Sequence, residues 1–197
     1  MRRALLVVVL GFGVAVTGVA CASAPKADID AANAAVAQAG TAGAGEYAAD
    51  SLKAAQDAQA ALETELKAQE GKWFKSYTKA TELAVAAKAA GEKAAADAAQ
   101  AKTKAKDEAT ASIADAKTQL GEAQALLEKA PKGKGTAADI EAMKTDLANA
   151  ASALADAEKS LAGERFLDAK TKAESAKTAA STVKTAVETA MAAKAKR

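Results

Sequence analysis

Apolar residues recur at three- and four-residue spacing along most of this chain, which is the period that places side chains on one face of an α-helix. The clearest series lies between Ala137 and Ala162, where a heptad pattern has large side chains at one position and mostly small ones at the other. It consists of Ile140, Met143, Leu147, Ala150, Leu154, Ala157 and Leu161. We therefore predict a helix over 137–162 that buries this series against a neighbouring helix.

The same spacing predicts a partner for this helix. After Gly163, apolar residues continue from Phe166 to Ala190, so we predict a second helix over 164–193. The single glycine favours an antiparallel hairpin, and alanine on the facing sides lets the two axes approach closely. A further helical segment, 109–129, is expected to complete a three-helix bundle with them.

The N-terminal half follows the same pattern with interruptions. We predict a short helix over 27–39, a break at the glycines that follow it, and a helix from about Tyr47 to Glu70. Asp50 and Ser51 suit the first turn of that helix. The interrupting glycines are Gly40, Gly43 and Gly45. We expect the helix ending at Glu70 to pack on the first half of the one after it.

That next helix is predicted to be long, from Trp73 to Glu128, because the spacing persists and no proline interrupts it before Pro131. At 1.5 Å per residue it spans about 80 Å. A kink near Gly91 or within 102–107 is the alternative to a straight helix.

Together these elements predict an all-α protein made of elongated antiparallel helical hairpins, a coiled-coil-like bundle with alanine-rich seams. The predicted divisions are a signal peptide over 1–20, a lipidated cysteine and tether over 21–27, an N-terminal hairpin with a long second helix over 28–130, a loop over 131–136, and a C-terminal hairpin over 137–197. Composition favours a thin shape. Hydrophobic residues make up 50% of the chain but aromatic residues only 3%, so most apolar groups are small and bury little surface each.

The N-terminal sequence predicts that the protein is targeted to a membrane. Two arginines precede the apolar stretch 4–20, and Cys21, the one cysteine of the chain, follows it directly. This layout resembles a bacterial lipoprotein signal with a lipobox at 17–21. The resemblance implies diacylglycerol on the sulfur of Cys21 and, after cleavage, an acyl group such as palmitate on its amine. An ordinary signal peptide or an uncleaved membrane anchor is the alternative.

The stretch 29–96 resembles a family of alanine-rich bacterial envelope lipoproteins that carry a two-helix domain of unknown function. The matching residues are the run Ala34–Gly45, Glu46-Tyr47-Ala48, Leu52, the turn Glu70-Gly71-Lys72-Trp73-Phe74, Ala80 and Ala84. The resemblance implies a lipid-anchored helical domain that faces the periplasm and has no catalytic residues to transfer. Ala22 after the cysteine favours delivery to the outer membrane.

Charge and composition argue against catalysis and nucleic-acid binding. Lysine and arginine number 27 against 25 acidic residues, the two signs are interspersed, and there is no histidine. Acidic pairs such as Asp107-Glu108 and Glu63 with Glu65 show no accompanying base or apolar pocket, so we interpret them as surface charges. No metal site is expected, and no cofactor beyond the acyl groups on Cys21.

Trp73, Phe74 and Tyr77 gather most of the aromatic mass at one turn. They form either a contact surface for a partner or an apolar plug that closes the end of the hairpin. The basic tail 194–197 is similar to the end of the major murein lipoprotein, whose terminal lysine is joined to peptidoglycan, except that Arg197 follows the last lysine here.

The sequence therefore predicts a non-enzymatic, lipid-anchored spacer or interaction scaffold of the cell envelope. Its expected partners are the membrane, an envelope protein or peptidoglycan, and a second copy of the chain. The alternatives are a binding module or carrier for lipid or envelope peptides, and a peptidoglycan-associated tether. The spacer and the carrier differ in whether the apolar stripes are buried against one another or left open.

Overall fold

The computed structural model describes residues 23–130 and 137–195, and within these ranges every regular element is a helix. The helices are α1 (Lys26–Thr41), α2 (Ala44–Tyr47), α3 (Ala49–Glu70), α4 (Thr78–Glu128), α5 (Ala137–Ala162) and α6 (Phe166–Ala195). This confirms the predicted all-α class. The predicted signal peptide, Cys21, the loop 131–136 and the last two residues lie outside the described residues.

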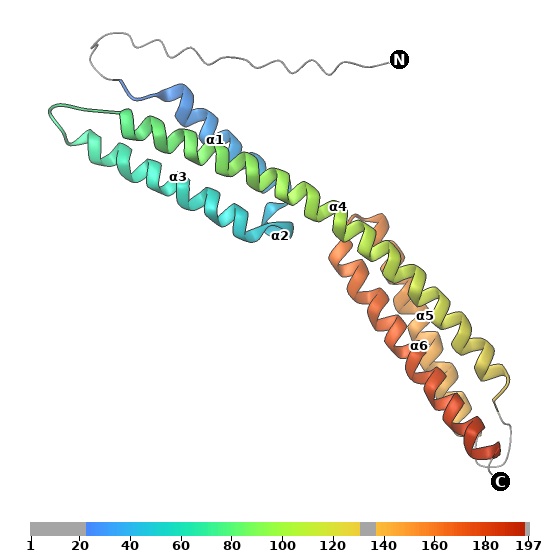
Figure 1. Cartoon of the computed structure of the whole chain (residues 1–197). Coiled ribbons are helices and arrows are strands. Elements are labelled where there is room, and N and C mark those ends of the chain that lie inside the picture. The colour runs from blue at the N-terminus through green and yellow to red at the C-terminus, as the bar shows by residue number, and fades with distance from the viewer. Residues whose placement is uncertain (1–22, 131–136, 196–197) are drawn as a thin grey trace, which may run out of the picture.

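Two three-helix bundles share α4 and lie end to end along it (Figure 1). Helices α1 and α3 pack on its N-terminal half, and α5 and α6 pack on its C-terminal half. Of the described helices, only α4 packs extensively against members of both bundles. The expected packing of α3 on α4, and of α5 and α6 with the end of α4, is present. Helix α1 is an additional member of the first bundle, beyond the hairpin predicted there.

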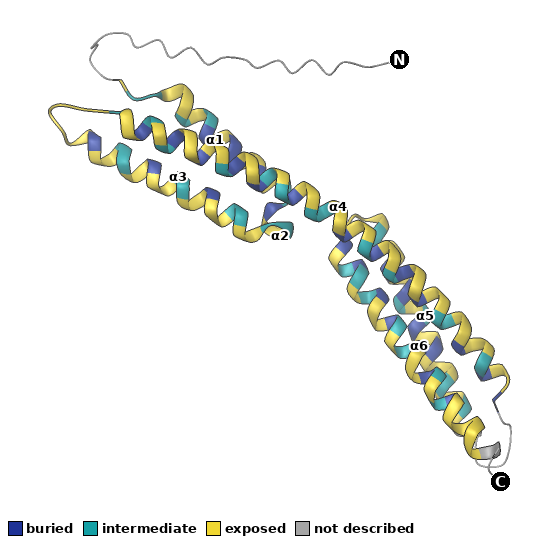
Figure 2. Ribbon diagram, in the orientation of Figure 1, coloured by how far each residue is buried: buried dark blue, intermediate teal, exposed yellow. Residues whose placement is uncertain are grey.

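Small side chains line the interior of both bundles. Figure 2 shows that the buried residues follow the inner side of each helix, with exposed residues on the outer side. In α4 they are Ala80, Ala84, Ala87, Gly91, Ala94, Ala98, Ala105, Ala109, Ile113, Ala116, Ala123 and Leu127. Because most of these side chains are methyl groups, the helix axes can lie close together and the bundles are thin.

Gly91 marks a close approach between the backbones of α1 and α4. A Cβ atom on this residue would lie 2.6 Å from the carbonyl carbon of Ala35 and 2.7 Å from the amide nitrogen of Val36. Helix α4 runs without interruption through this position and through 102–107, over 51 residues or about 77 Å. Gly91 is therefore a contact point of two backbones and not a helix break.

Helices α4 and α6 run parallel in a fixed register. Four ion pairs join residues that are 62 positions apart in the sequence. They are Lys102–Glu164 at 2.7 Å, Glu108–Lys170 at 2.8 Å, Asp115–Lys177 at 3.0 Å and Glu122–Lys184 at 2.6 Å. The last three recur at heptad spacing, as do the flanking ion pairs of a coiled coil.

Several helix ends differ from the prediction. Helix α4 begins at Thr78 and not at Trp73, because residues 71–77 form a turn and an irregular link. At the α5–α6 turn it is Glu164, with a φ of 57°, that adopts the left-handed conformation, and not the neighbouring glycine. No side chain caps the start of α3, where the N-cap residue is Ala48, and Ser51 donates a hydrogen bond across to Asp97 on α4.

Candidate functional site

The turn between α3 and α4 carries the most exposed aromatic side chains among the described residues. Trp73 is 91% exposed and Phe74 is 86% exposed, at the outer tip of the first bundle (Figure 1). Tyr77 differs, because it is half-buried and packs against the cluster that contains Leu62 and Leu66. The structure thus assigns the role of apolar plug to Tyr77 alone and leaves the other two aromatic side chains facing outward.

Gln69 holds this turn in place from inside. Its side chain is 4% exposed, donates a hydrogen bond to Glu65 at 2.6 Å, and accepts one from the backbone N–H of Ser76 at 3.1 Å. The backbone N–H of Lys72 donates to the carbonyl oxygen of Gln69 at 3.1 Å. These hydrogen bonds hold the turn in the conformation that leaves Trp73 and Phe74 exposed. Gln69 was not predicted from the sequence, although a glutamine three residues after Leu66 on an apolar face was a usable signal.

Lysines flank the aromatic pair. Lys72 and Lys75 are exposed on either side of it, and no acidic residue lies within 71–77. Behind the turn, Glu65 is paired with Lys79 at 3.1 Å. The hydrogen bond from Gln69, followed by that from Lys79, lowers the pKa of Glu65, so this carboxylate is ionised and already neutralised by a partner.

A polar cluster at the α5–α6 turn brings a serine and a lysine together, as a nucleophilic site requires. Lys172 lies 3.1 Å from the hydroxyl of Ser160. That hydroxyl, however, is fully buried and donates a hydrogen bond to Asp168 at 2.7 Å, while Lys172 is ion-paired with the same carboxylate at 2.8 Å. A nucleophile needs an accessible oxygen and a neutral base. We interpret this cluster as one that stabilises the turn, and no pattern in the sequence indicated it.

In each acidic pair noted in the sequence, one member, Glu65 or Glu108, is ion-paired with a lysine. Glu108 faces Lys170 on α6, and the hydrogen bond from this lysine is the main cause that lowers the pKa of Glu108. Asp107 and Glu63 are exposed. A general acid at neutral pH requires a raised pKa, which is the opposite shift. In the described ranges, no group of acidic, histidine or cysteine side chains is arranged to hold a metal ion.

Tyr47 connects the two bundles. Its ring packs against Phe166 at the start of α6 and against Ala105 and Ala109 of α4. Burial, followed by the charge of Glu46 beside it, raises the pKa of Tyr47. Its hydroxyl is buried and has no hydrogen-bond partner among the residues that the structure describes. This position is structural, because the ring contributes apolar contact at the joint.

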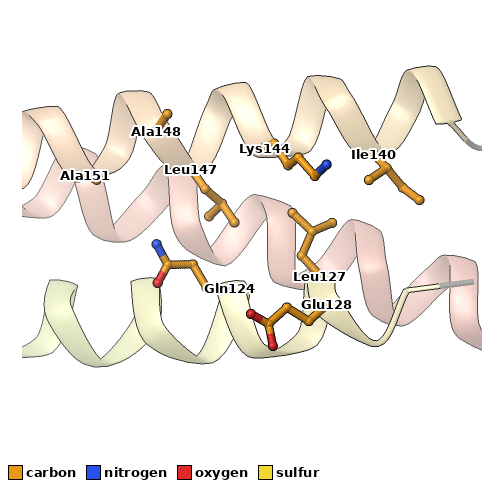
Figure 3. Close-up of a pocket in the computed structure, with 8 residues that line it drawn as sticks. All are labelled: Gln124, Leu127, Glu128, Ile140, Lys144, Leu147, Ala148 and Ala151. Atoms are coloured by element: carbon orange, nitrogen blue, oxygen red, sulfur yellow. The ribbon is translucent and has the colours of Figure 1, made fainter.

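A groove of about 510 Å³ lies between α4 and α5 near the outer end of the second bundle. Figure 3 shows Gln124 and Leu127 pointing from α4 toward α5, and Leu147 pointing back. Its volume is within the range of small-molecule sites. Its apolar floor is already packed, however, since Leu127 is 8% exposed and Leu147 is 4% exposed, and Glu128 and Lys144 are among the residues that line the rest of the groove.

Two further results bear on the type of protein. Of the helices in 23–130 and 137–195, none combines the length and the apolar character needed to cross a bilayer. No protein-family model matches the chain, and the searches of curated proteins and of solved structures returned no match either.

Proposed function

We propose that this protein is a non-enzymatic spacer or interaction scaffold of the bacterial cell envelope, anchored through lipid on Cys21 and facing the periplasm. The observation that carries the proposal is the arrangement of two bundles in series on one helix. Helix α4 alone spans about 77 Å. Such a shape holds two points of the envelope at a distance, which a rounded domain of the same chain length does not.

The burial of the apolar stripes supports a scaffold over a carrier. The stripes of α1, α3, α5 and α6 face α4 and form five clusters of buried residues along its length. A carrier that lays amphipathic helices around a ligand needs one such face to be open in the free protein. The charged outer faces pair with one another and with solvent, as on other solvated helical rods.

Small-angle scattering of the acylated chain tests the shape. A thin rod as long as α4 has a radius of gyration of about 22 Å. A compact domain of about 175 residues has one of about 16 Å. We expect a value at or above the first number, together with helicity that does not change when phospholipid is added. A value near the second number would contradict the spacer.

The anchor and the partner need separate tests. Mass spectrometry of the protein purified from membranes is expected to show acyl groups on Cys21, and Cys21→Ser is expected to remove them. Crosslinking in cells should then join the protein to peptidoglycan or to an envelope protein. If the acylated chain has no macromolecular neighbour in such an experiment, the scaffold role is wrong even though the anchor is real.

The groove between α4 and α5 favours the carrier as a second candidate. Ile140 on its rim is only half-buried and offers apolar surface to a ligand. A fatty acid that bound there would raise the melting temperature by mass action. Ile140→Asp would abolish that rise, and a native chain whose melting temperature does not rise when fatty acid is added would dismiss this candidate.

A further inference from the structure

The aromatic turn lies at the end of the molecule where the chain enters the fold. Helix α1 runs parallel to α4, since Ala32 packs in one cluster with Ala80 and Ala84, whereas Val36 lies beside Gly91, about two turns after Ala84 along α4. Ile29, one turn into α1, belongs to the same cluster as Tyr77. The start of α1 and the turn 71–77 are therefore neighbours at one end of the rod (Figure 1).

The chain between the proposed anchor and this end is short. Cys21 precedes Lys26, the first residue of α1, by five positions. Five residues span at most about 17 Å even when fully extended. An acylated Cys21 therefore keeps the turn within reach of the bilayer surface, and Figure 1 shows that the turn projects at the tip of the first bundle.

The side chains of the turn have the chemistry of a membrane interface. Indole and phenyl rings partition to the boundary between headgroups and acyl chains, where the indole N–H retains a polar partner. The side chains of Lys72 and Lys75 have apolar stems with charged ends, which allows them to extend past the rings to lipid phosphates. Each lysine near an anionic surface increases partitioning about five-fold. The hydrogen bonds of Gln69 hold the rings outward in advance, which reduces the cost of ordering them.

We propose that the segment Lys72–Lys75 is a second membrane contact, which enters the headgroup region of the bilayer that carries the acyl chains of Cys21. The proposal rests on the proposed anchor. Two aromatic residues and two lysines bind a bilayer weakly when alone, but the anchor raises their local concentration and makes the second contact intramolecular. With two points of attachment, the first bundle has a defined orientation on the membrane.

Trp73 is the one tryptophan of the chain, so its fluorescence reports on this turn alone. The experiment uses the full acylated protein in vesicles of phosphatidylethanolamine and phosphatidylglycerol. We expect the emission of Trp73 to shift to the blue, acrylamide to quench it several-fold less than it quenches free indole, and acyl chains brominated near the headgroup to quench it strongly.

Matched variants separate the contact from the anchor. Lys72→Glu with Lys75→Glu, and separately Phe74→Ala, retain Trp73 and change only exposed side chains, so the fold is kept and bromine quenching should fall several-fold. The position control combines Trp73→Phe with Met191→Trp. Met191 is 37% exposed near the far end of α6, and a tryptophan there should remain unquenched by the lipid.

The outcomes distinguish the two proposals. An acylated, vesicle-bound chain whose Trp73 emits as in water overturns the second contact and leaves the anchor intact. Absence of acyl groups from Cys21 overturns both. Burial of Trp73 that disappears as the lipid-to-protein ratio is raised assigns the turn to a second copy of the chain. Burial that requires an added envelope protein or peptidoglycan assigns it to that partner, and either result overturns the membrane contact.

Discussion

At the scale of single residues, the size of a side chain decides how close two helices come. The alanine spacing predicted which faces are buried, because a periodic pattern is a local property of the sequence. It did not predict the role of Gly91, since a glycine in a helix permits either a bend or a close contact. The choice depends on Ala35 and Val36, which lie in another helix and are not part of the local pattern.

Replacement of Gly91 by alanine tests this contact. The new Cβ would lie within 3 Å of three backbone atoms of Ala35 and Val36, and backbone cannot move aside as a flexible side chain does. Overpacking costs about 1–3 kcal/mol, from which the better helix propensity of alanine subtracts up to about 1 kcal/mol. We expect Gly91→Ala to lower the free energy of unfolding by about 1–2 kcal/mol in urea denaturation.

Gly121 in the same helix provides the control. A Cβ atom there has no neighbour within 4 Å. Gly121→Ala should therefore raise the free energy of unfolding by about 1 kcal/mol, through helix propensity alone. Equal effects of the two substitutions would show that the backbones of α1 and α4 do not meet at Gly91.

At the scale of helices, charges on the outer faces determine register as well as solubility. The sequence predicted that these charges are solvated, because lysine and acidic residues are interspersed along the chain and no single pair of them indicates a contact between two helices. The regular offset between α4 and α6 becomes visible only when the two helices are known to be parallel. Exposed pairs are individually weak, so the repetition of the pattern, and not one contact, specifies the register.

A charge exchange tests whether these pairs specify the register. Substituting lysine for Glu108, Asp115 and Glu122 would place three lysines opposite three lysines of α6. We expect the melting temperature to fall by several degrees in low salt and by less at about 1 M salt, where charges are screened within about 3 Å. Glutamate at the three facing positions, Lys170, Lys177 and Lys184, should restore the melting temperature. Failure of this second set to restore it would argue against the pairing.

At the scale of the whole molecule, titration follows from the same ion pairs. Hydrogen bonds accepted from lysine, or in Glu65 first from Gln69, lower the pKa values of five carboxyl groups: Glu65, Asp97, Glu108, Glu164 and Asp168. The hydrogen bonds that Lys102, Lys170 and Lys184 donate to their partner glutamates raise the pKa values of these three lysines. The chain contains no histidine that would titrate between these two groups.

The stability of the protein should therefore be level from about pH 5 to about pH 10. A carboxyl group with a lowered pKa in the folded state stabilises fully above its ordinary value of 4.5 or 3.8, and this stabilisation is lost as the pH falls through the folded value. The lysines stabilise fully below 10.5, and this is lost as the pH rises through their raised values. Thermal melting followed by circular dichroism across this range checks the prediction, and a step between about pH 6 and 8 would contradict it.

The aromatic turn shows where sequence analysis stopped short of the whole molecule. Clustering of three aromatic residues at one turn marked it as a candidate contact, but spacing alone assigned all three to one role. Tyr77 packs inward because it precedes α4 directly and faces Leu62 and Leu66. Trp73 and Phe74 lie in the turn itself, where no helix period determines the direction of a side chain. Their proximity to the start of α1 depended on a third helix whose packing the sequence did not predict.

The sharing of α4 has a mechanical consequence. Among the described helices, α4 alone continues from one bundle into the other. At this joint it is supported by the contact of Tyr47 with Phe166 and by the ion pair Lys102–Glu164. A three-helix bundle resists bending more than one helix does, so thermal bending concentrates at this joint. With the first bundle held at a membrane surface, bending at the joint would change the angle between the second bundle and that surface. The joint would therefore determine both the mean angle of the second bundle and the area that its outer end samples.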